Sequence, residues 1–372
     1  MLTAFKNGVI FTGKEKIANK TLLVEKGLIV DLISPEDIPS NAKVIDLTGN
    51  YLAPGLIDLQ IYGSGGRLLG AYPDSETLRQ MECDLLSAGT TGFLATVATN
   101  SDETVEKAIE ASVNYRKAAI GNFLGLHLEG PFLNPKRRGA HPEKYIKKGD
   151  VNTVKKWVKA ASGEIKMITI APELQSRELT DYLNDSGIII SAGHTDATYT
   201  EALSFLSQSV QAATHLYNAM SPIHHRSPGI IPAIFERQPY TSIVADGIHV
   251  SFPMISLAKR ELGDKLFLIT DAVTETWEGE YRHKLHTDHY TLPDGTLSGS
   301  SLTLLKAVEN CTKHAGIPLD EALRMGSIYP AKLLRSDKTE GFIKRGYKAN
   351  LLCFNKLFEV VNVWLSNQIN GI

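Results

Sequence analysis

The chain has 372 residues and a nearly balanced charge, with 39 Lys and Arg residues against 41 Asp and Glu residues and a formal net charge of −2. Its hydrophobic content of 43% and charged content of 22% are close to globular averages, which excludes disordered, collagen-like and coiled-coil chains. The length fits one large domain with an appendage, or two domains, because α/β barrels commonly reach ~250 residues. The balanced charge provides no broad basic surface, so we expect no nucleic acid and no membrane as partner.

Cysteine usage and the start of the chain indicate the compartment. Cys83, Cys311 and Cys353 lie far apart and form no C-x-x-C pair, so the sequence supports neither a disulfide framework nor a thiolate zinc site. The first residues lack the basic segment followed by a long apolar run that marks a secretory signal. No stretch approaches the ~18 apolar residues needed to span a bilayer. We therefore expect a soluble, cytoplasmic protein that is not exported.

The first 53 residues contain short β-rich segments separated by turn signals. Asn7-Gly8 and Lys26-Gly27 are dipeptides typical of tight turns. The segments between such turns predict a small antiparallel sheet. They span residues 9–12, 21–24, 28–33 and 43–46.

After Pro54-Gly55 the pattern changes to compact apolar strands that alternate with longer helical patterns, which is typical of βα units and a parallel sheet. Leu78, Met81 and Leu85, for example, recur at helical spacing. Eight candidate strands are the number that closes a (β/α)₈ barrel, so an α/β fold with a TIM-like barrel is predicted. The candidate strands span residues 56–60, 92–97, 123–128, 166–170, 188–192, 212–215, 241–245 and 266–270.

The last part of the chain adds a hairpin and further helices. A hairpin is predicted around Pro293-Asp294-Gly295, followed by helices over 302–314 and 319–325. The tail then returns to the β-rich composition of the first residues, so we expect both ends to pair in one small discontinuous β-sandwich domain. The predicted domains are residues 1–53 plus 343–372 for the β domain and residues 54–342 for the barrel.

Polar residues stand at the ends of several predicted strands, where the function of such a barrel collects. Glu129 and His215 close the third and sixth strands, and His194 follows the fifth. Two imidazoles and a carboxylate that leave positions open are what a catalytic Zn²⁺ or Fe²⁺-like ion requires. Asp271, after the eighth strand, is expected as the general base that takes a water proton and passes it to the leaving group.

Each of these residues also has a structural interpretation. A single His after an apolar strand is more often a core or loop residue, so the metal interpretation depends on the strand-end residues taken together. His127 is expected behind the site or in the core. His283, His286 and His289 resemble a metal motif, but they fall in a predicted hairpin where this spacing alternates faces, so a solvated loop is predicted.

The glycine-rich segment Gly63-Ser64-Gly65-Gly66 resembles a phosphate loop superficially. It lacks the third glycine of G-x-G-x-x-G and the G-K-[ST] ending of a P-loop, so a permissive turn is predicted. The sequence has no G-x-S-x-G elbow, and nucleophilic serine chemistry therefore has no support.

Six motifs occur in order along the chain, namely HLEGPFLNP at 127–135, KRRGAHP at 136–142, SAGHTDA at 191–197, THLYNAMSP at 214–222, VADGIHV at 244–250 and LITDAV at 268–273. Together they resemble the N-acetylglucosamine-6-phosphate deacetylase family of the amidohydrolase superfamily. The tail, with SIYPA at 327–331 followed by GFI at 341–343 and GYKAN at 346–350, is also similar to that superfamily. The resemblance covers essentially the whole chain.

The resemblance implies a role for each matching residue. Glu129, His194 and His215 would bind the metal. Asp271 would shuttle the proton, and His141 would hydrogen-bond the acetyl oxygen as it becomes an oxyanion. The remaining matching residues would hold or touch the phosphorylated amino sugar; they are Ala140, Asn218, Ala219, Arg226, Asp246, Gly247, Ile248, His249, Leu297, Ser298 and Gly299.

Arg226 and His249 are the residues expected at the 6-phosphate, because a guanidinium offers a planar fork that matches phosphate oxygens and an imidazole adds a second donor. In the family, the arginine and the histidine of this anion site typically come from a neighbouring subunit, so a homodimer is implied. The alternative for Arg226 is a solvated loop cation beside His224 and His225.

The first predicted strand departs from the pattern of many amidohydrolases, which end it with H-x-H and carry two metals. Here the positions hold Gln60 and Tyr62, and the tyrosine departs even from the Q-x-N of other one-metal deacetylases. Neither an amide nor a phenol is a good Zn²⁺ ligand. We therefore predict one divalent metal per active site, Zn²⁺ or Fe²⁺.

The expected reaction is hydrolysis of the N-acetyl group of N-acetylglucosamine 6-phosphate to glucosamine 6-phosphate and acetate, in amino-sugar catabolism. One alternative is another amidohydrolase acting on a different N-acyl or cyclic amide. Such enzymes usually have an H-x-H pair and a modified lysine after the fourth strand, where this chain has Glu173. A second alternative is a catalytically silent phosphosugar-binding protein, which would be expected to have lost the base or the metal ligands.

Overall fold

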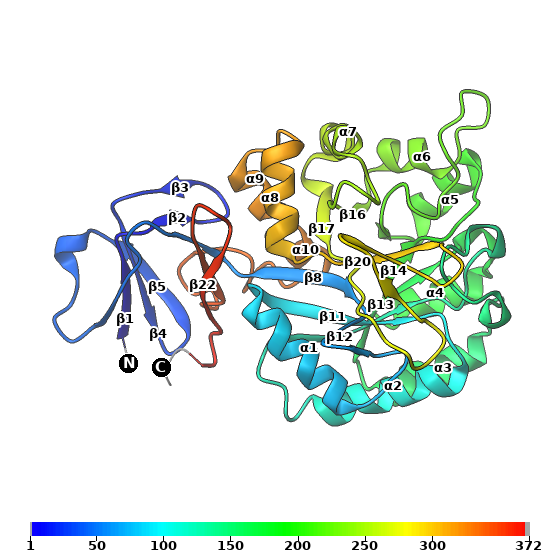
Figure 1. The fold of residues 1–372 in the computed structure, drawn as a ribbon, viewed down its shortest axis with the longest axis horizontal. Helices are drawn as coiled ribbons and strands as arrows, with labels where there is room; N and C mark the ends of the chain where they lie inside the picture. Colours follow the sequence, from blue (N-terminus) through cyan, green and yellow to red (C-terminus); the bar gives the residue numbers. More distant parts are fainter. Residues whose placement is uncertain (1, 369–372) are drawn as a thin grey trace.

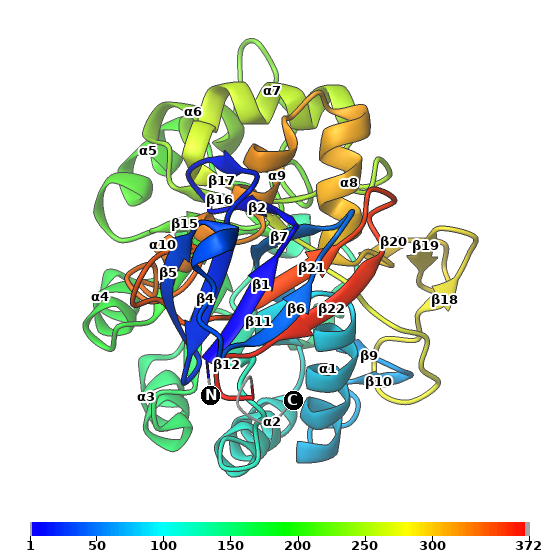
Figure 2. The same ribbon diagram turned by 90° about the vertical axis from the view of Figure 1, so that its left-hand side faces the viewer.

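The computed structural model describes residues 2–368 and has two parts (Figure 1). The larger part is a ring of parallel strands with helices around it. The smaller part contains β-sheets built from both ends of the chain, which face the viewer in Figure 2. The expected barrel with a small β appendage is therefore present.

The eight-stranded parallel sheet forms the barrel, and its strands follow one another in chain order. Its two ends meet through backbone hydrogen bonds, from Asp271 N to Gln60 O (2.9 Å) and from Tyr62 N to Ala272 O (3.0 Å). Every predicted strand has a counterpart here, so the (β/α)₈ fold class is confirmed. The strands are β8 (Leu56–Ile61), β11 (Thr90–Ala98), β12 (Phe123–Glu129), β13 (Ile165–Ile170), β14 (Ile189–Ala192), β15 (Ala212–Ala213), β16 (Tyr240–Val244) and β17 (Leu266–Ile269).

Several of the helices begin at polar caps and bury one apolar face. Asp74 caps the first, its carboxylate accepting from Thr77 N (2.8 Å), and the predicted face of Leu78, Met81 and Leu85 is buried. The α-helices are α1 (Ser75–Ser87), α2 (Asp102–Tyr115), α3 (Val151–Ala161), α4 (Arg177–Asp185), α5 (Tyr199–Gln208), α6 (Ile230–Arg237), α7 (Phe252–Leu262), α8 (Leu304–His314), α9 (Leu319–Met325) and α10 (Ile328–Leu333). Short 3₁₀ helices are η1 (Pro35–Asp37), η2 (Pro135–Arg137), η3 (Glu143–Tyr145), η4 (Pro172–Leu174) and η5 (Gly263–Lys265).

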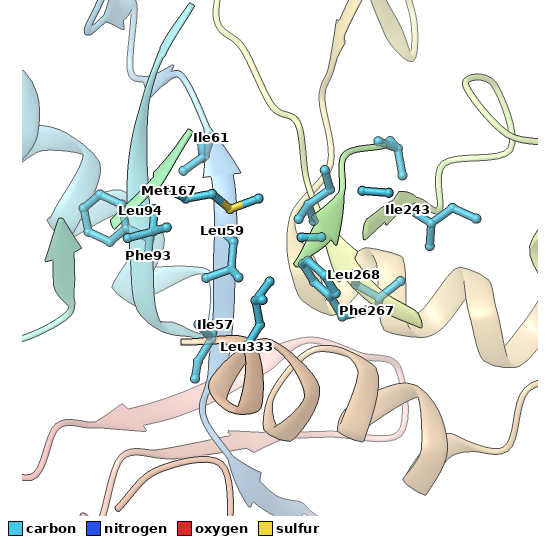
Figure 3. Close-up of a cluster of buried hydrophobic side chains, with 14 of the residues drawn as sticks. Ile57, Leu59, Ile61, Phe93, Leu94, Met167, Ile243, Phe267, Leu268 and Leu333 are labelled. Atoms are coloured by element: carbon cyan, nitrogen blue, oxygen red, sulfur yellow. The ribbon is translucent and has the colours of Figure 1, made fainter. Parts of the chain in front are cut away.

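The barrel strands carry buried apolar side chains along their length (Figure 3). Ile57, Leu59 and Ile61 alternate along β8, and Leu333 of α10 lies near the end where this strand begins. Met167 of β13 belongs to the same cluster of buried side chains. This close-packed frame fixes the strand ends, which the site requires.

Two sheets make up the smaller part, with strand orders β5-β4-β1-β6 and β22-β21-β7-β2-β3. The predicted pairing of the two chain ends is seen where Leu352 of β21 lies opposite Ala53 of β7, and where Phe5 and Trp364 pack edge to face with ring centroids 4.8 Å apart. The strands are β1 (Leu2–Lys6), β2 (Val9–Phe11), β3 (Lys16–Ile17), β4 (Thr21–Glu25), β5 (Leu28–Ile33), β6 (Lys43–Asp46), β7 (Tyr51–Pro54), β21 (Leu351–Phe354) and β22 (Val360–Trp364).

The prediction of an antiparallel terminal sheet is partly wrong. β1 pairs with β6, and β2 with β7, in parallel. These partners are not joined by tight turns, and a long connection allows either direction. The domain boundaries at 53/54 and 342/343 stay predictions, and residues 1 and 369–372 of the predicted β domain lie outside the described residues.

Short strands surround the mouth of the barrel. β9 (Gly63–Ser64) and β10 (Arg67–Leu68) form a hairpin whose turn is Gly65-Gly66, so the glycine-rich segment contains the predicted permissive turn. β18 (Lys284–Leu285), β19 (His289–Thr291) and β20 (Leu297–Ser300) form the sheet that was expected as a hairpin. Within residues 2–368, none of the helices has the length and apolar character to cross a membrane.

Candidate active site

A pocket of about 220 Å³ opens at the carboxyl ends of the barrel strands. Its lining includes Glu129, His194, His215 and Asp271, which the sequence predicts as metal ligands and base. It also includes many of the residues matched to the sugar. These are Ala140, His141, Asn218, Ala219, His249, Leu297, Ser298 and Gly299.

The predicted metal ligands meet around one carboxylate. His215 Nε2 lies 3.1 Å from Glu129 Oε1 and 3.1 Å from His194 Nε2, and His194 Nε2 lies 3.4 Å from the same carboxylate oxygen. All three side chains are buried. Glu129 closes β12, His194 follows β14 by two residues and His215 follows β15 by two. Strand ends of a parallel barrel face one mouth, which explains how residues so distant in sequence converge.

His141 is a further nitrogen at the same place. One ligand atom each from Glu129, His141 and His194 lies within 4.8 Å of the others, a geometry that could hold a metal ion. His141 Nε2 is 3.2 Å from Glu129 Oε2. The sequence predicts His141 as a partner of the acetyl oxygen, so its closeness to the ligands is a property that the tertiary structure adds.

These residues fit a divalent cation. Glu129 is fully buried, and among residues 2–368 its ion-pair partners are histidines, with no Lys or Arg beside it. A buried carboxylate needs a compensating positive charge, which a metal would supply. His194 Nδ1 donates to Arg137 O (2.9 Å), so Nε2 keeps its lone pair toward the site. The Nδ1 atom of His215 is buried without a hydrogen-bond partner among the described residues.

The pKa values of the predicted metal ligands follow from burial and mutual charge. Burial lowers the pKa of His194 to about 4, with the charge of His141 adding to the effect, which favours the neutral form that binds metal. For Glu129, burial alone would raise the pKa, but the charge of His141 and hydrogen bonds from the surrounding imidazoles hold it well below its usual range. The pKa of His215 is raised overall: burial lowers it, but the hydrogen bond and the charge of the Glu129 carboxylate outweigh burial.

Three of the strand-end residues have a strained backbone. His194, His215 and Asp271 have φ angles of 48°, 34° and 54°, in the left-handed region that non-glycine residues rarely adopt. Each such residue costs of order ~1–3 kcal/mol, and clusters of them mark functional sites. The surrounding barrel therefore holds these side chains in place against a local cost.

Gln60 of the first barrel strand and Tyr62, directly after that strand, lie between the predicted base and the predicted metal ligands. Gln60 Nε2 donates to Asp271 Oδ1 (2.7 Å) and Glu129 Oε1 (2.9 Å). The Tyr62 hydroxyl lies 3.1 Å from Asp271 Oδ1 and makes a short hydrogen bond to Glu129 Oε2. Burial raises the pKa of Asp271; the imidazole of His215 opposes this, and the Glu129 carboxylate reinforces it.

On the sugar side, His249 is held between two acceptors. Its Nδ1 donates to Asp246 Oδ2 (2.5 Å) and its Nε2 donates to Ser298 O (2.5 Å). Burial lowers the pKa of His249, but the hydrogen bond and charge of Asp246 outweigh burial and raise it overall. Asp246 also accepts from the backbone N–H of Ile248, and Gly247 has φ 82°, where a Cβ would lie 2.6 Å from Phe252. The 246–248 stretch thus orients His249 without lining the pocket.

Arg226 lies elsewhere. It is exposed on the loop over residues 221–229, outside the lining of the pocket in its own chain. The loop projects from the barrel between α5 and α6 (Figure 1). His249, by contrast, lines the pocket of its own chain.

Sequence reasoning missed several pocket residues. The prediction of a solvated loop is wrong for His283, which is buried, lines the pocket and places Nδ1 3.0 Å from Ser298 Oγ, whereas His286 is exposed. Burial lowers the pKa of His283 to about 4. Tyr281, two residues earlier, lines the pocket as well. In the sequence, Tyr281 and His283 alternate with the charged residues Arg282 and Lys284, and this period of two is a signal that could have found both. His127 is buried behind the site as predicted, with Nε2 2.7 Å from Thr169 Oγ1.

Comparison with known proteins relates this geometry to a family. The profile of the amidohydrolase family matches residues 51–371, and that of the NagA composite domain matches residues 3–52. The N-acetylglucosamine-6-phosphate deacetylase of Haemophilus influenzae is 32% identical over 380 residues, covering 99% of each chain. That of Bacillus subtilis is 33% identical over 377 residues, covering 96% of this chain and 94% of the relative.

Solved structures agree with these relatives. The crystal structure of N-acetylglucosamine-6-phosphate deacetylase from Pasteurella multocida superposes with a TM-score of 0.94 at 35% identity and covers 99% of each chain. A deacetylase from Mycobacterium smegmatis, solved in complex with N-acetyl-D-glucosamine-6-phosphate, shares the fold with a TM-score of 0.90 at 24% identity over 98% of each chain. The chain belongs to the N-acetylglucosamine-6-phosphate deacetylase family of the amidohydrolase superfamily.

Proposed function

We propose that the protein hydrolyses the N-acetyl group of N-acetylglucosamine 6-phosphate to glucosamine 6-phosphate and acetate, in amino-sugar catabolism. The observation that carries this proposal is a buried carboxylate surrounded by histidines, with Asp271 beside it, in a chain that matches curated deacetylases over its full length. A deacetylase needs a water, a polarised carbonyl and a proton carrier, and the pocket has groups for each.

Glu129, His194 and His215 are the residues proposed to hold one divalent ion, Zn²⁺ or Fe²⁺. When bound, such an ion supplies Lewis acidity toward the acetyl oxygen and lowers the pKa of a water. Asp271 takes the proton of the attacking water and delivers it to the sugar nitrogen as the carbon–nitrogen bond breaks. Gln60 Nε2 donates a hydrogen bond to Asp271 Oδ1 (2.7 Å), which orients this carboxylate.

His141 is proposed to stabilise the oxyanion. Its Nε2 faces Glu129 Oε2 at 3.2 Å, so a proton on this nitrogen points to the place where the acetyl oxygen gains charge. A donor already in position when charge develops is worth ~10²- to 10³-fold in rate.

The sugar and its phosphate are proposed to lie toward Asn218, Ala219 and the 297–299 turn. Both ring nitrogens of His249 already donate to Asp246 and Ser298 O, so His249 is proposed to favour the phosphate by its charge, not by a hydrogen bond of its own. Arg226 is too exposed on its loop to serve the pocket of its own chain. We therefore assign it to the pocket of a neighbouring subunit, which makes a homodimer the working unit. With a net charge of −2, selectivity for a phosphorylated sugar has to rest on such local groups.

Acetate release tests the proposal. Purified protein is assayed on N-acetylglucosamine 6-phosphate and on the unphosphorylated sugar, with and without a chelator and after metal readdition. We expect turnover that needs metal and favours the phosphorylated sugar. No release under any metal condition would favour the silent phosphosugar-binding alternative, and release from other N-acyl or cyclic amides instead would favour a different amidohydrolase.

A further inference from the structure

Tyr281 reaches the pocket from the segment between β17 and β18. Its side chain is 6% exposed, and its ring stacks on His283 with centroids 5.9 Å apart and an interplanar angle of 21°. Its hydroxyl meets two groups at hydrogen-bond distance, namely Thr99 O at 2.7 Å and His141 Nδ1 at 2.8 Å. The phenol therefore connects Thr99, directly after β11, to His141.

The direction of these two hydrogen bonds follows from counting protons. The phenol has one proton, and the Thr99 carbonyl can accept but cannot donate. If the phenol proton pointed at His141, a lone pair of the phenol oxygen would face a lone pair of the Thr99 carbonyl oxygen, which is unfavourable. The phenol therefore donates to Thr99 O, and the proton between His141 and Tyr281 sits on His141 Nδ1.

This arrangement determines which atom of His141 faces the chemistry. With Nδ1 donating to Tyr281, the ring turns Nε2 toward Glu129 Oε2 at 3.2 Å and His194 Nε2 at 3.3 Å. The Glu129 carboxylate only accepts, so Nε2 also acts as a donor and keeps the proton that the acetyl oxygen needs. A ring flip would lose the Tyr281 hydrogen bond and leave a buried nitrogen without its partner, which is costly. The Tyr281 hydroxyl is thus the group that selects this orientation.

Both ends of this chain of hydrogen bonds are anchored. The Thr99 hydroxyl donates to the backbone oxygen of Glu129 (3.0 Å), which ties the acceptor of the phenol to the strand that carries a metal ligand. On the other side, Glu280 accepts from Lys144 Nζ (3.0 Å) and Tyr145 Oη (2.8 Å), so the Tyr281 segment is also clamped to the loop of His141. Tyr281 therefore links His141, which lies on a loop, to the rigid end of a barrel strand.

We propose that Tyr281 is a positioning residue of the deacetylase reaction, which holds the His141 ring in the orientation that serves the acetyl oxygen. The inference rests on the role of His141 in the proposed function. Tyr281 does not touch the reacting atoms itself, and its effect passes through His141.

The test begins with Tyr281→Phe, which removes the hydroxyl and keeps the ring on His283. Loss of an outer hydrogen-bond partner of this kind typically costs ~10- to 100-fold, so we expect kcat to fall by about that factor while KM changes by less than about threefold. Tyr290→Phe is the matched control, because Tyr290 belongs to the same cluster of buried side chains but does not line the pocket. We expect it to leave kcat unchanged.

A double-variant cycle separates positioning from a structural role. If Tyr281 acts through His141, adding Tyr281→Phe to His141→Ala lowers kcat by less than about threefold, because the two changes share one effect. The proposal would be overturned if the kcat losses of the two single variants multiplied in the double variant. A normal kcat in Tyr281→Phe alone would overturn it too. Thermal unfolding of each variant shows whether it folds.

Nitrogen-15 spectra of histidine-labelled, metal-free protein give a readout that does not depend on activity. The His141 resonances are assigned by their absence in His141→Ala. We expect a protonated Nδ1 in the wild type and a shift of this resonance in Tyr281→Phe, with no shift in Tyr290→Phe. Unchanged His141 resonances in Tyr281→Phe would overturn the proposal. An inactive wild type with the expected spectra would instead count against the proposed function alone.

Discussion

The proposed metal side and the proposed sugar side of the pocket are built in different ways. Glu129 and His215 stand at or just after barrel strands, and the barrel holds their backbones. Arg226 instead lies on an exposed loop, and Tyr281 and His283 lie on a long segment before β18. Topology alone brings the strand ends together, whereas the loop residues depend on particular side-chain contacts.

We infer from this difference that the barrel strands hold the proposed catalytic groups and that the loops determine substrate selectivity. Ligands and base must stay in place through the reaction, and a close-packed barrel offers the rigidity that this needs. Substrate recognition tolerates and even benefits from variable loops. Tyr281 connects the two regions, since its hydroxyl bonds both the strand-end Thr99 and the loop residue His141.

The largest effect is expected on the strand-end side, from Asp271→Asn. An amide cannot accept the water proton, so kcat should fall ~10²- to 10⁴-fold or more, the usual worth of general acid–base catalysis. Calorimetric titration with N-acetylglucosamine 6-phosphate should still show binding. Near-normal turnover in this variant would remove Asp271 from the mechanism.

Arg226→Ala tests the loop side. Loss of a charged hydrogen-bond partner costs ~1.5–3 kcal/mol, so KM for the phosphorylated sugar should rise about 10- to 100-fold with little change in kcat. The unphosphorylated sugar should be unaffected, and His225→Ala on the same loop is the matched control. An equal loss on both sugars would contradict a phosphate contact. A monomer in light scattering with a normal KM would contradict the shared site.

The closure of the barrel under the strand ends depends on Asp58, which accepts from Thr270 Oγ1 and Thr270 N. Burial raises the pKa of Asp58 from 3.8 to about 7. Between pH 3.8 and about pH 7, Asp58 is protonated in the folded protein and ionised in the unfolded chain. The free energy of unfolding therefore falls as pH rises, by at most about 1.4 kcal/mol per pH unit.

Urea unfolding of metal-free protein from about pH 5 to about pH 7 measures this slope. Asp58→Asn should remove the contribution and flatten the curve relative to the wild type. Asp46→Asn is the control, because Asp46 is exposed and a hydrogen bond to Thr48 lowers its pKa, so its contribution does not change over this range. Parallel curves for Asp58→Asn and the wild type would contradict the assignment.

The smallest expected change is in metal content. Gln60 and Tyr62 occupy the positions of an H-x-H pair, so elemental analysis should find one equivalent of Zn²⁺ or Fe²⁺ per chain. Replacing both by histidine should allow a second equivalent, whereas Tyr62→Phe should keep one. Two equivalents per chain in the fully active wild type would show that these residues do not limit the site.

Much of the fold follows from local patterns in the sequence. The alternation of apolar strands with amphipathic helices predicts the barrel, because each βα unit must bury its apolar faces against the next. The left-handed backbones of His194 and Asp271 could not be predicted, since the chain adopts them only because the surrounding barrel outweighs their local cost.

The sequence by itself determined the barrel, the strand-end positions of Glu129, His215 and Asp271, and the family resemblance. These follow from periodicity and from motifs that are local in the chain. The tertiary structure alone decided that His141 lies beside the proposed metal ligands, that His283 is buried, and that the Tyr281 hydroxyl bonds His141. Such contacts join loops far apart in sequence, and no local pattern records which loops will meet.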